Sequence, residues 1–256
     1  MTEQSDLWIR RFSPERKDGP RLVCFPHAGG SATFFRPLAQ QLASVTTAGV
    51  QYPGRQDRLA EPCLGDIPAL ADAVFEALRP WTDRPLVFFG HSMGAVVAFE
   101  VARRFRQDGE AGVPLALFVS GRRAPSVHRE EHVHKRDDQG LIAEIRKLSG
   151  TANSLLDDEE VLRMILPATR ADYRAIETHR HRPGHPLRCP IVALTGDADP
   201  RVTVDETRPW AEQTTGSFDL RVLPGGHFYL SDDWAATARS VAALLAAHPA
   251  EAARVI

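Results

Sequence analysis

A serine flanked by glycines is the first sign of chemistry in this 256-residue sequence. Gly90-His91-Ser92-Met93-Gly94 has the form G-x-S-x-G, in which a strained turn between a strand and a helix lifts the serine off the sheet. A serine hydroxyl is a weak nucleophile until a neighbouring base removes its proton. The pattern therefore predicts a nucleophile at Ser92, which needs a histidine and an acid within reach.

His227 is the best-placed base for this serine. It follows two glycines on a loop after the last predicted strand, where its ring could swing over Ser92. A carboxylate beside such a histidine fixes the imidazole tautomer and stabilises the imidazolium that forms. Asp197 and Asp199 both lie just past a late strand, and the residues alone do not decide between them.

Two backbone amides are candidates for stabilising an oxyanion. Met93 begins the helix after the turn, and the first N–H groups of a helix have no partner within it. The loop Pro26-His27-Ala28-Gly29-Gly30 follows an early strand, and such a loop can turn a second N–H inward, here that of Ala28. We expect His27 to pack within this loop and to take no direct part in catalysis.

The elements around these residues alternate between strand and helix. Apolar runs predict buried strands at 22–25, 86–89, 115–120 and 190–194. Further strands are predicted at 45–50 and 218–223, with an edge strand at 7–12. Apolar residues at helical spacing predict helices at 34–42, 67–78, 95–109 and 234–247. The order serine, aspartate, histidine is that of the α/β-hydrolases, so we predict an α/β-hydrolase fold with a mostly parallel central sheet flanked by helices.

One polar region interrupts the alternation. Residues 124–186 contain short predicted helices at 141–148 and 159–170, a further segment at 171–178, and many charged side chains. This composition predicts a helical lid, inserted between the two parts of a hydrolase core at 1–123 and 187–256. Lids over hydrolase sites control entry and exclude water.

The histidines of this region could suggest a metal site. No His-Glu-x-x-His pattern is present, so we interpret them as a solvated face of the lid. The residues concerned are His128, Glu130, Glu131, His132, His134, His179, His181 and His185.

Several arginines could bind anions. Arg122 and Arg123, with the lid arginines, could form a positive surface for an acidic partner, but acids are interleaved with them. Arg55 could bind a substrate carboxylate or phosphate, and a structural salt bridge is the interpretation that we favour.

Bulk composition narrows the class of protein. The net charge of −2 and the 25% of charged residues give no reason to expect a nucleic acid or an anionic membrane as partner. Cys24, Cys63 and Cys189 have no metal-like spacing and fit a reducing cytosol. No signal peptide or membrane-spanning run is evident. We expect a cytoplasmic enzyme without a metal or cofactor, with a monomer as the default.

Five motifs in this order closely resemble the type II thioesterases, the free-standing editing enzymes that accompany polyketide synthases and non-ribosomal peptide synthetases. The resemblance runs from about residue 20 to 245 and is weakest in the lid. The motifs are Phe25-Pro-His-Ala-Gly-Gly-Ser-Ala32, Gln51-Tyr-Pro-Gly-Arg55, Gly90-His-Ser-Met-Gly-Ala95, Gly196-Asp-Ala-Asp-Pro200 and Gly225-Gly-His-Phe-Tyr229.

The resemblance implies hydrolysis of acyl thioesters held on the phosphopantetheine arm of an acyl or peptidyl carrier protein. It assigns the acid to Asp199 and the oxyanion amides to Ala28 and Met93. Two other interpretations remain: a small-molecule carboxylesterase with the same Ser-His-Asp set, and a catalytically silent hydrolase fold that acts as a binding protein. The intact set of Ser92, aspartate and His227 argues against the silent protein.

Overall fold

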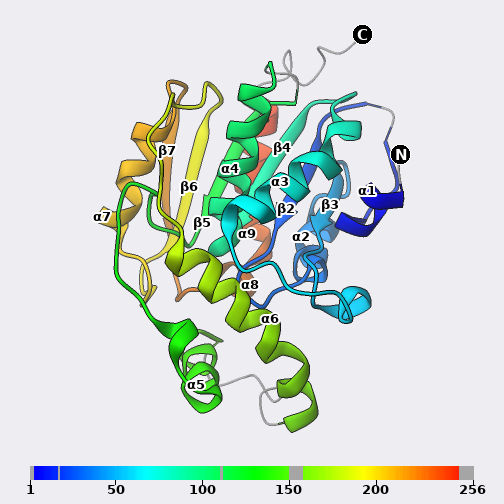
Figure 1. Ribbon diagram of the computed structural model, residues 1–256. Coiled ribbons are helices and arrows are strands. Elements are labelled where there is room, and N and C mark those ends of the chain that lie inside the picture. Colours follow the sequence, from blue (N-terminus) through cyan, green and yellow to red (C-terminus); the bar gives the residue numbers. More distant parts are fainter. Residues whose placement is uncertain (1–2, 17, 110–111, 150–157, 248–256) are drawn as a thin grey trace.

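A seven-stranded sheet forms the centre of the computed structural model, which describes residues 3–16, 18–109, 112–149 and 158–247 (Figure 1). The strand order is β1-β3-β2-β4-β5-β6-β7. β1 runs antiparallel to β3, and the other neighbouring strands are parallel, which confirms the predicted sheet. The strands are β1 (Ile9–Arg11), β2 (Arg21–Phe25), β3 (Thr46–Val50), β4 (Leu86–His91), β5 (Ala116–Ser120), β6 (Ile191–Gly196) and β7 (Phe218–Leu223).

Helices cover both faces of the sheet because successive strand residues point to opposite sides. Val23 and Phe25 belong to a core cluster with residues of α1, α3 and α4, whereas Leu22 and Cys24 belong to a second cluster with residues of α2 and α9. Figure 1 shows α3 and α4 in front of the sheet and α9 behind it. These helices are α1 (Glu3–Trp8), α2 (Arg36–Gln41), α3 (Ile67–Leu78), α4 (Met93–Gln107) and α9 (Trp234–Ala247).

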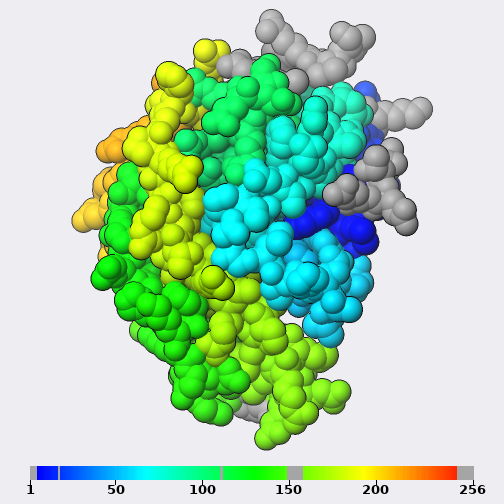
Figure 2. Space-filling view, in the orientation of Figure 1, coloured from blue at the N-terminus to red at the C-terminus, as the bar shows by residue number. Residues whose placement is uncertain are grey.

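Two helices stand between β5 and β6, where the lid was predicted. They are α5 (Asp138–Ser149) and α6 (Glu159–Thr178), and Asp158 caps α6 by accepting the amides of Glu160 and Val161. Leu166 and Tyr173 of α6 form a small cluster with α5, while Ala175 and Ile176 belong to the main core. Figure 2 shows the yellow-green α6 segment between the green α5 segment and the cyan segment before α3. α6 therefore joins the insertion to the core.

The structure corrects three predicted elements. Residues 7 and 8, predicted as part of the edge strand, are instead the last two residues of α1. Trp8 packs there into the core beneath the guanidinium of Arg58. The helix predicted at 34–42 is divided: Ala32–Phe35 form a 3-10 helix, and α2 begins at Arg36 with Pro37 in its first turn. The helix predicted at 159–170 continues through the segment 171–178, where Ala175 and Ile176 are buried, and it passes Pro167 because buried side chains on both sides of the proline offset its cost of about 3 kcal/mol.

The domain boundaries at 123/124 and 186/187 stay predictions, as does any movement of a lid. Residues 150–157 of the predicted lid and 248–256 of the predicted core lie outside the described residues. Two short helices, α7 (Val204–Thr207) and α8 (Tyr229–Asp232), follow β6 and β7. Among the described helices, none has the length and apolar character needed to cross a membrane.

Candidate active site

Ser92 lies in a strained turn between β4 and α4. Its φ of 54° and ψ of −116° fall where a side chain is sterically unfavourable. The Ser92 amide donates to the carbonyl oxygen of Ser120 at 2.8 Å, which fixes the turn to β5. A Cβ at Gly94 would lie 2.0 Å from the carbonyl oxygen of Phe25, so the start of α4 can approach β2 only with glycine there.

A chain of two hydrogen bonds joins Ser92, His227 and Asp199. The Ser92 hydroxyl lies 3.0 Å from Nε2 of His227, and Nδ1 of His227 lies 2.8 Å from Oδ2 of Asp199. Because the carboxylate can only accept, Nδ1 carries the proton and Nε2 is left to accept from the serine. The side chains of His227 and Asp199 are 4% and 0% exposed, so water barely competes for these bonds.

Geometry distinguishes the two aspartates that follow β6. The second oxygen of Asp199 accepts the amide of Arg201 at 2.8 Å, which holds the carboxylate towards His227. Asp197 is exposed, and its carboxylate accepts the amide of Gly225 at 2.9 Å. Asp197 thus ties together the loops that carry Asp199 and His227, and it makes no hydrogen bond with the imidazole.

Aromatic rings surround His227. The ring centroids of His91 and Phe228 lie 5.1 and 5.2 Å from that of His227. The ring centroids of His27 and Phe34 lie 4.5 Å apart, as predicted for a histidine that has a packing role. Burial, together with the charge of His227, lowers the pKa of His27 to about 3 and that of His91 well below its ordinary range. His27 and His91 are therefore neutral at neutral pH.

A buried polar chain behind these rings was not found from the sequence. Nδ1 of His91 lies 2.9 Å from Oγ of Ser120, which lies 2.6 Å from the hydroxyl of Tyr229. The chain connects the ends of β4 and β5 to the loop of His227. Its members are far apart in the sequence and form no local motif, so no sequence signal identified it.

The loop with the second predicted oxyanion amide is held by α6. The amide of Gly29, next to Ala28, donates to Oδ2 of Asp172 at 2.8 Å. A Cβ at Gly29 would lie 2.4 Å from Oγ1 of Thr169, so loop and helix are in close contact. The same loop adjoins the start of α4, where Met93 is the first helical residue. The roles of Ala28 and Met93 stay predictions.

Arg55 forms a buried ion pair with the same aspartate. Its Nη1 and Nη2 lie 2.6 and 3.0 Å from the two oxygens of Asp172, and the side chains are 8% and 0% exposed. Nη1 also donates to the carbonyl oxygen of Gly30 at 3.1 Å. The predicted structural salt bridge is confirmed. The sequence analysis did not identify Asp172 as the partner of Arg55. The available signal was an acid on the buried face of an amphipathic helix, which needs a buried partner.

The predicted solvated face of the lid is partly wrong. His128, His132 and His185 are exposed, as predicted. Glu131 instead pairs with Arg123 and Arg201, His134 binds the buried Glu177, and the side chain of His179 is only 11% exposed. The pair of His134 and Glu177 fastens the segment after β5 onto α6, whereas Glu131 connects that segment to Arg201 after β6. Within the described ranges, no three His, Cys, Asp or Glu side chains are grouped to hold a metal ion.

Arg55→Leu tests the buried ion pair, because it leaves the carboxylate of Asp172 buried without its partner. We expect the free energy of unfolding to fall by about 3–5 kcal/mol, as is usual for breaking a buried pair. The matched control is Arg163→Leu, whose pair with Glu159 is exposed and should contribute less than about 1 kcal/mol. Urea denaturation measures both losses, and equal losses would contradict the expectation.

His27→Phe tests the burial of a neutral imidazole. At pH values between the folded pKa of about 3 and the ordinary pKa of 6.5, His27 is protonated in the unfolded chain and neutral in the folded one. This contribution to stability is therefore complete above pH 6.5 and declines by about 1.4 kcal/mol per pH unit below it. The phenylalanine variant should show a shallower decline by that amount in denaturation series from neutral to acidic pH. An unchanged slope would argue that His27 is not buried as neutral imidazole.

Known proteins resemble this chain in sequence and in architecture. Residues 20–245 match the model of the thioesterase domain family. Thioesterase PikA5 of Streptomyces venezuelae is 52% identical over 237 residues, which cover 91% of this chain and 84% of that relative.

Two solved structures define the class more narrowly. The type II thioesterase BorB, from the borrelidin biosynthetic cluster, has 52% sequence identity and a TM-score of 0.88, with 94% of this chain and 98% of BorB covered. YbtT, a type II thioesterase from the Yersiniabactin NRPS/PKS biosynthetic pathway, has 31% identity and a TM-score of 0.83, with 93% and 98% covered. The chain therefore belongs to the thioesterase family, and it is a type II thioesterase with an α/β-hydrolase fold that hydrolyses thioesters.

Proposed function

We propose that this thioesterase removes acyl groups from the phosphopantetheine arms of acyl or peptidyl carrier proteins, as an editing enzyme of polyketide or non-ribosomal peptide synthesis. The observation that carries the chemistry is the hydrogen-bonded chain from Ser92 through His227 to Asp199. The setting of BorB and YbtT in such biosynthetic systems supports a carrier protein as the partner.

In the first half of the reaction, Ser92 becomes acylated. Nε2 of His227 accepts the hydroxyl proton as Oγ attacks the thioester carbonyl carbon, and Asp199 stabilises the imidazolium. The N–H groups of Met93 and Ala28 donate to the oxyanion. The C–S bond then breaks, and His227 gives its proton to the departing pantetheine sulfur. The product is an acyl ester on Ser92 and a free thiol on the carrier.

In the second half, water replaces the carrier thiol. His227 accepts a proton from a water molecule as the water oxygen attacks the acyl-serine carbonyl, and the same two amides stabilise the oxyanion. The bond between the acyl carbon and Oγ breaks, and His227 returns the proton to Ser92. A free acid leaves, and the arm can be loaded again.

The proposal needs no cofactor of the enzyme's own, because the phosphopantetheine belongs to the carrier protein. We further propose that the enzyme works as a monomer in the cytoplasm. Cys24, Cys63 and Cys189 are free thiols, as expected of a protein in a reducing compartment.

Release of free acid from an acetyl-loaded carrier protein tests the proposed activity. The same acetyl group on pantetheine alone and on an oxygen ester serves for comparison, and Ser92→Ala is the control. We expect fastest turnover on the carrier, because its contacts add binding energy, and only residual turnover in the variant. Equal or faster turnover of the oxygen ester would favour a general carboxylesterase, and full turnover by Ser92→Ala would exclude the proposed nucleophile.

Asp199→Asn and Asp197→Asn form a matched pair of variants. An asparagine at 199 would favour the wrong imidazole tautomer, so we expect kcat to fall by up to about 10⁴-fold, as for triad aspartates in general. Asp197→Asn keeps an oxygen that can accept the Gly225 amide and should retain most activity. Measured kcat values on one acyl pantetheine, with circular dichroism to check folding, decide the matter. A greater loss of kcat in Asp197→Asn than in Asp199→Asn would assign the role of the acid to Asp197.

A further inference from the structure

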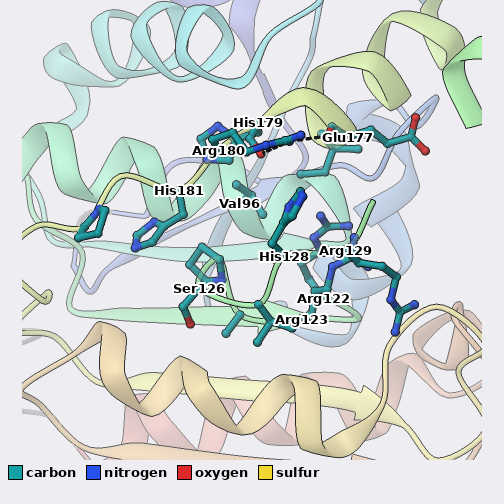
Figure 3. Close-up of a pocket in the computed structure, with 15 residues that line it drawn as sticks. Val96, Arg122, Arg123, Ser126, His128, Arg129, Glu177, His179, Arg180 and His181 are labelled. Carbon is teal, nitrogen blue, oxygen red and sulfur yellow. Dashed lines mark hydrogen bonds between the residues drawn. The ribbon is translucent and has the colours of Figure 1, made fainter. Parts of the chain in front are cut away.

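A cavity of about 300 Å³ lies beside the candidate active site and has no role in the mechanism above. Residues 122–129, which follow β5, line one side, and residues 176–183, at the end of α6 and beyond, line the other (Figure 3). Val96 of α4 also lines it, one helical turn after Ser92. The cavity therefore borders the helix that begins at the proposed nucleophile, but the three residues of the hydrogen-bonded chain are not in its lining.

Buried nitrogen atoms without partners gather around this cavity. They are Nε of Arg122, Nη1 of Arg123, Nε2 of His179 and Nδ1 of His181, and no described residue forms a hydrogen bond with them, although Nε2 of His179 lies 3.8 Å from a carboxylate oxygen of Glu100. The large majority of buried polar side-chain atoms in proteins do have a partner. Four such nitrogens on one cavity point to a hydrogen-bond acceptor that comes from outside the chain.

The charge of Arg122 is only partly offset by nearby carboxylates. Its neighbour Arg123 pairs with Glu131, whereas no ion pair within the described part of the chain uses the guanidinium of Arg122. Burial, with the charges of Arg123 and Arg201, lowers the pKa of Arg122 to about 9 although the carboxylates of Glu131 and Glu177 act in the opposite direction, so the side chain is still a cation at neutral pH. An anion in the cavity would offset both the burial and the like charges.

The carboxylates next to the cavity are already engaged. Glu177 lines its wall, but the two carboxylate oxygens accept the amides of Val133 and His134 at 2.9 and 3.0 Å. Burial lowers the pKa of His179 and that of His181, so both rings are neutral at neutral pH and can offer N–H donors. The lining carries four guanidinium groups, of which those of Arg123 and Arg129 pair with Glu131 and Glu206, against the single carboxylate of Glu177, so its net charge is positive.

We propose that this cavity is a subsite for one oxyanion group of the substrate, a phosphate or a carboxylate, bound by the guanidinium of Arg122 and by imidazole N–H groups of His179 and His181. A guanidinium presents paired N–H donors that match two oxygens of such a group. The inference rests on the proposed function, which supplies two sources. One is the phosphate of the phosphopantetheine arm, and the other is the terminal carboxylate of a dicarboxylic acyl group.

Three thioesters separate these two sources. Acetyl-pantetheine carries neither anion, acetyl-phosphopantetheine adds only the phosphate, and malonyl-pantetheine adds only the carboxylate. For wild type and Arg122→Gln, kcat and KM are measured on each. We expect the variant to raise KM for one of the anionic thioesters about tenfold more than for acetyl-pantetheine, equivalent to about 1.4 kcal/mol of binding. Arg122→Lys, which keeps the charge but not the paired donors, should recover part of this loss.

Arg129→Gln is the matched control, because Arg129 lines the same cavity but its guanidinium pairs with Glu206. It should change KM equally for the three thioesters. A selective rise with acetyl-phosphopantetheine identifies the phosphate, and one with malonyl-pantetheine identifies the carboxylate. No selective effect of Arg122→Gln, or one as large in Arg129→Gln, would overturn the subsite.

The proposed function and the subsite can fail separately. If wild type turned over neither acetyl-pantetheine nor an acetyl-loaded carrier, the proposed function alone would be contradicted. Calorimetric titration of free phosphopantetheine and of malonate into wild type and Arg122→Gln would then still test the subsite. Binding of one of them to wild type, weakened about tenfold in the variant, would support it, and equal binding to both proteins would overturn it.

Discussion

Parallel pairing of the strands is the constraint on which the site depends. β2, β4, β5, β6 and β7 run in one direction, so their carboxyl ends meet at one edge of the sheet. Four of these ends are followed by the loop of Ala28, then Ser92, Asp199 and His227 of the candidate active site, and the end of β5 is followed by Arg122 of the proposed subsite. Groups that are 135 positions apart in the sequence are thereby brought within 3.0 Å of each other.

The core on both faces of the sheet keeps the turn at Ser92 in place. A non-glycine residue in a sparsely populated backbone region costs about 1–3 kcal/mol, and the surrounding contacts must offset that cost. Here β4 is buried on both faces, the Ser92 amide is bonded to β5, and the glycine after Met93 rests against β2. The conformation that exposes the hydroxyl is thus determined by long-range packing as well as by the local motif.

The sequence alone was sufficient to predict those features of the fold and the site that leave a local pattern. β2, β4, β5 and β6 appear as apolar runs because both faces of a parallel sheet are covered, whereas β3 and β7 contain polar residues. Ser92 and His227 stand in short glycine-rich motifs. Asp199 could be preferred over Asp197 only through the family resemblance, because both follow the same strand.

Features built from distant residues could not be predicted in this way. Asp172 lies 117 positions from Arg55 and 143 from Gly29, and the chain of His91, Ser120 and Tyr229 has no motif. The end of α6 was missed, because only the fold shows that Ala175 and Ile176, beyond the predicted end of the helix, pack into the main core. Tertiary packing overrode local propensity at that helix, as it did at Trp8 in α1.

The attachment of α6 at Asp172 limits how the insertion can open. Tilting the whole helix away would leave two charges unpaired in the interior and would release the amide of Gly29, so the loop of Ala28 would lose its support. Before Asp172, Thr169 also lies against Gly29 of this loop, and Pro167 lacks the N–H that would bond to the preceding turn. A movement of the insertion that kept the loop of Ala28 assembled would therefore have to leave Asp172 and Thr169 in place.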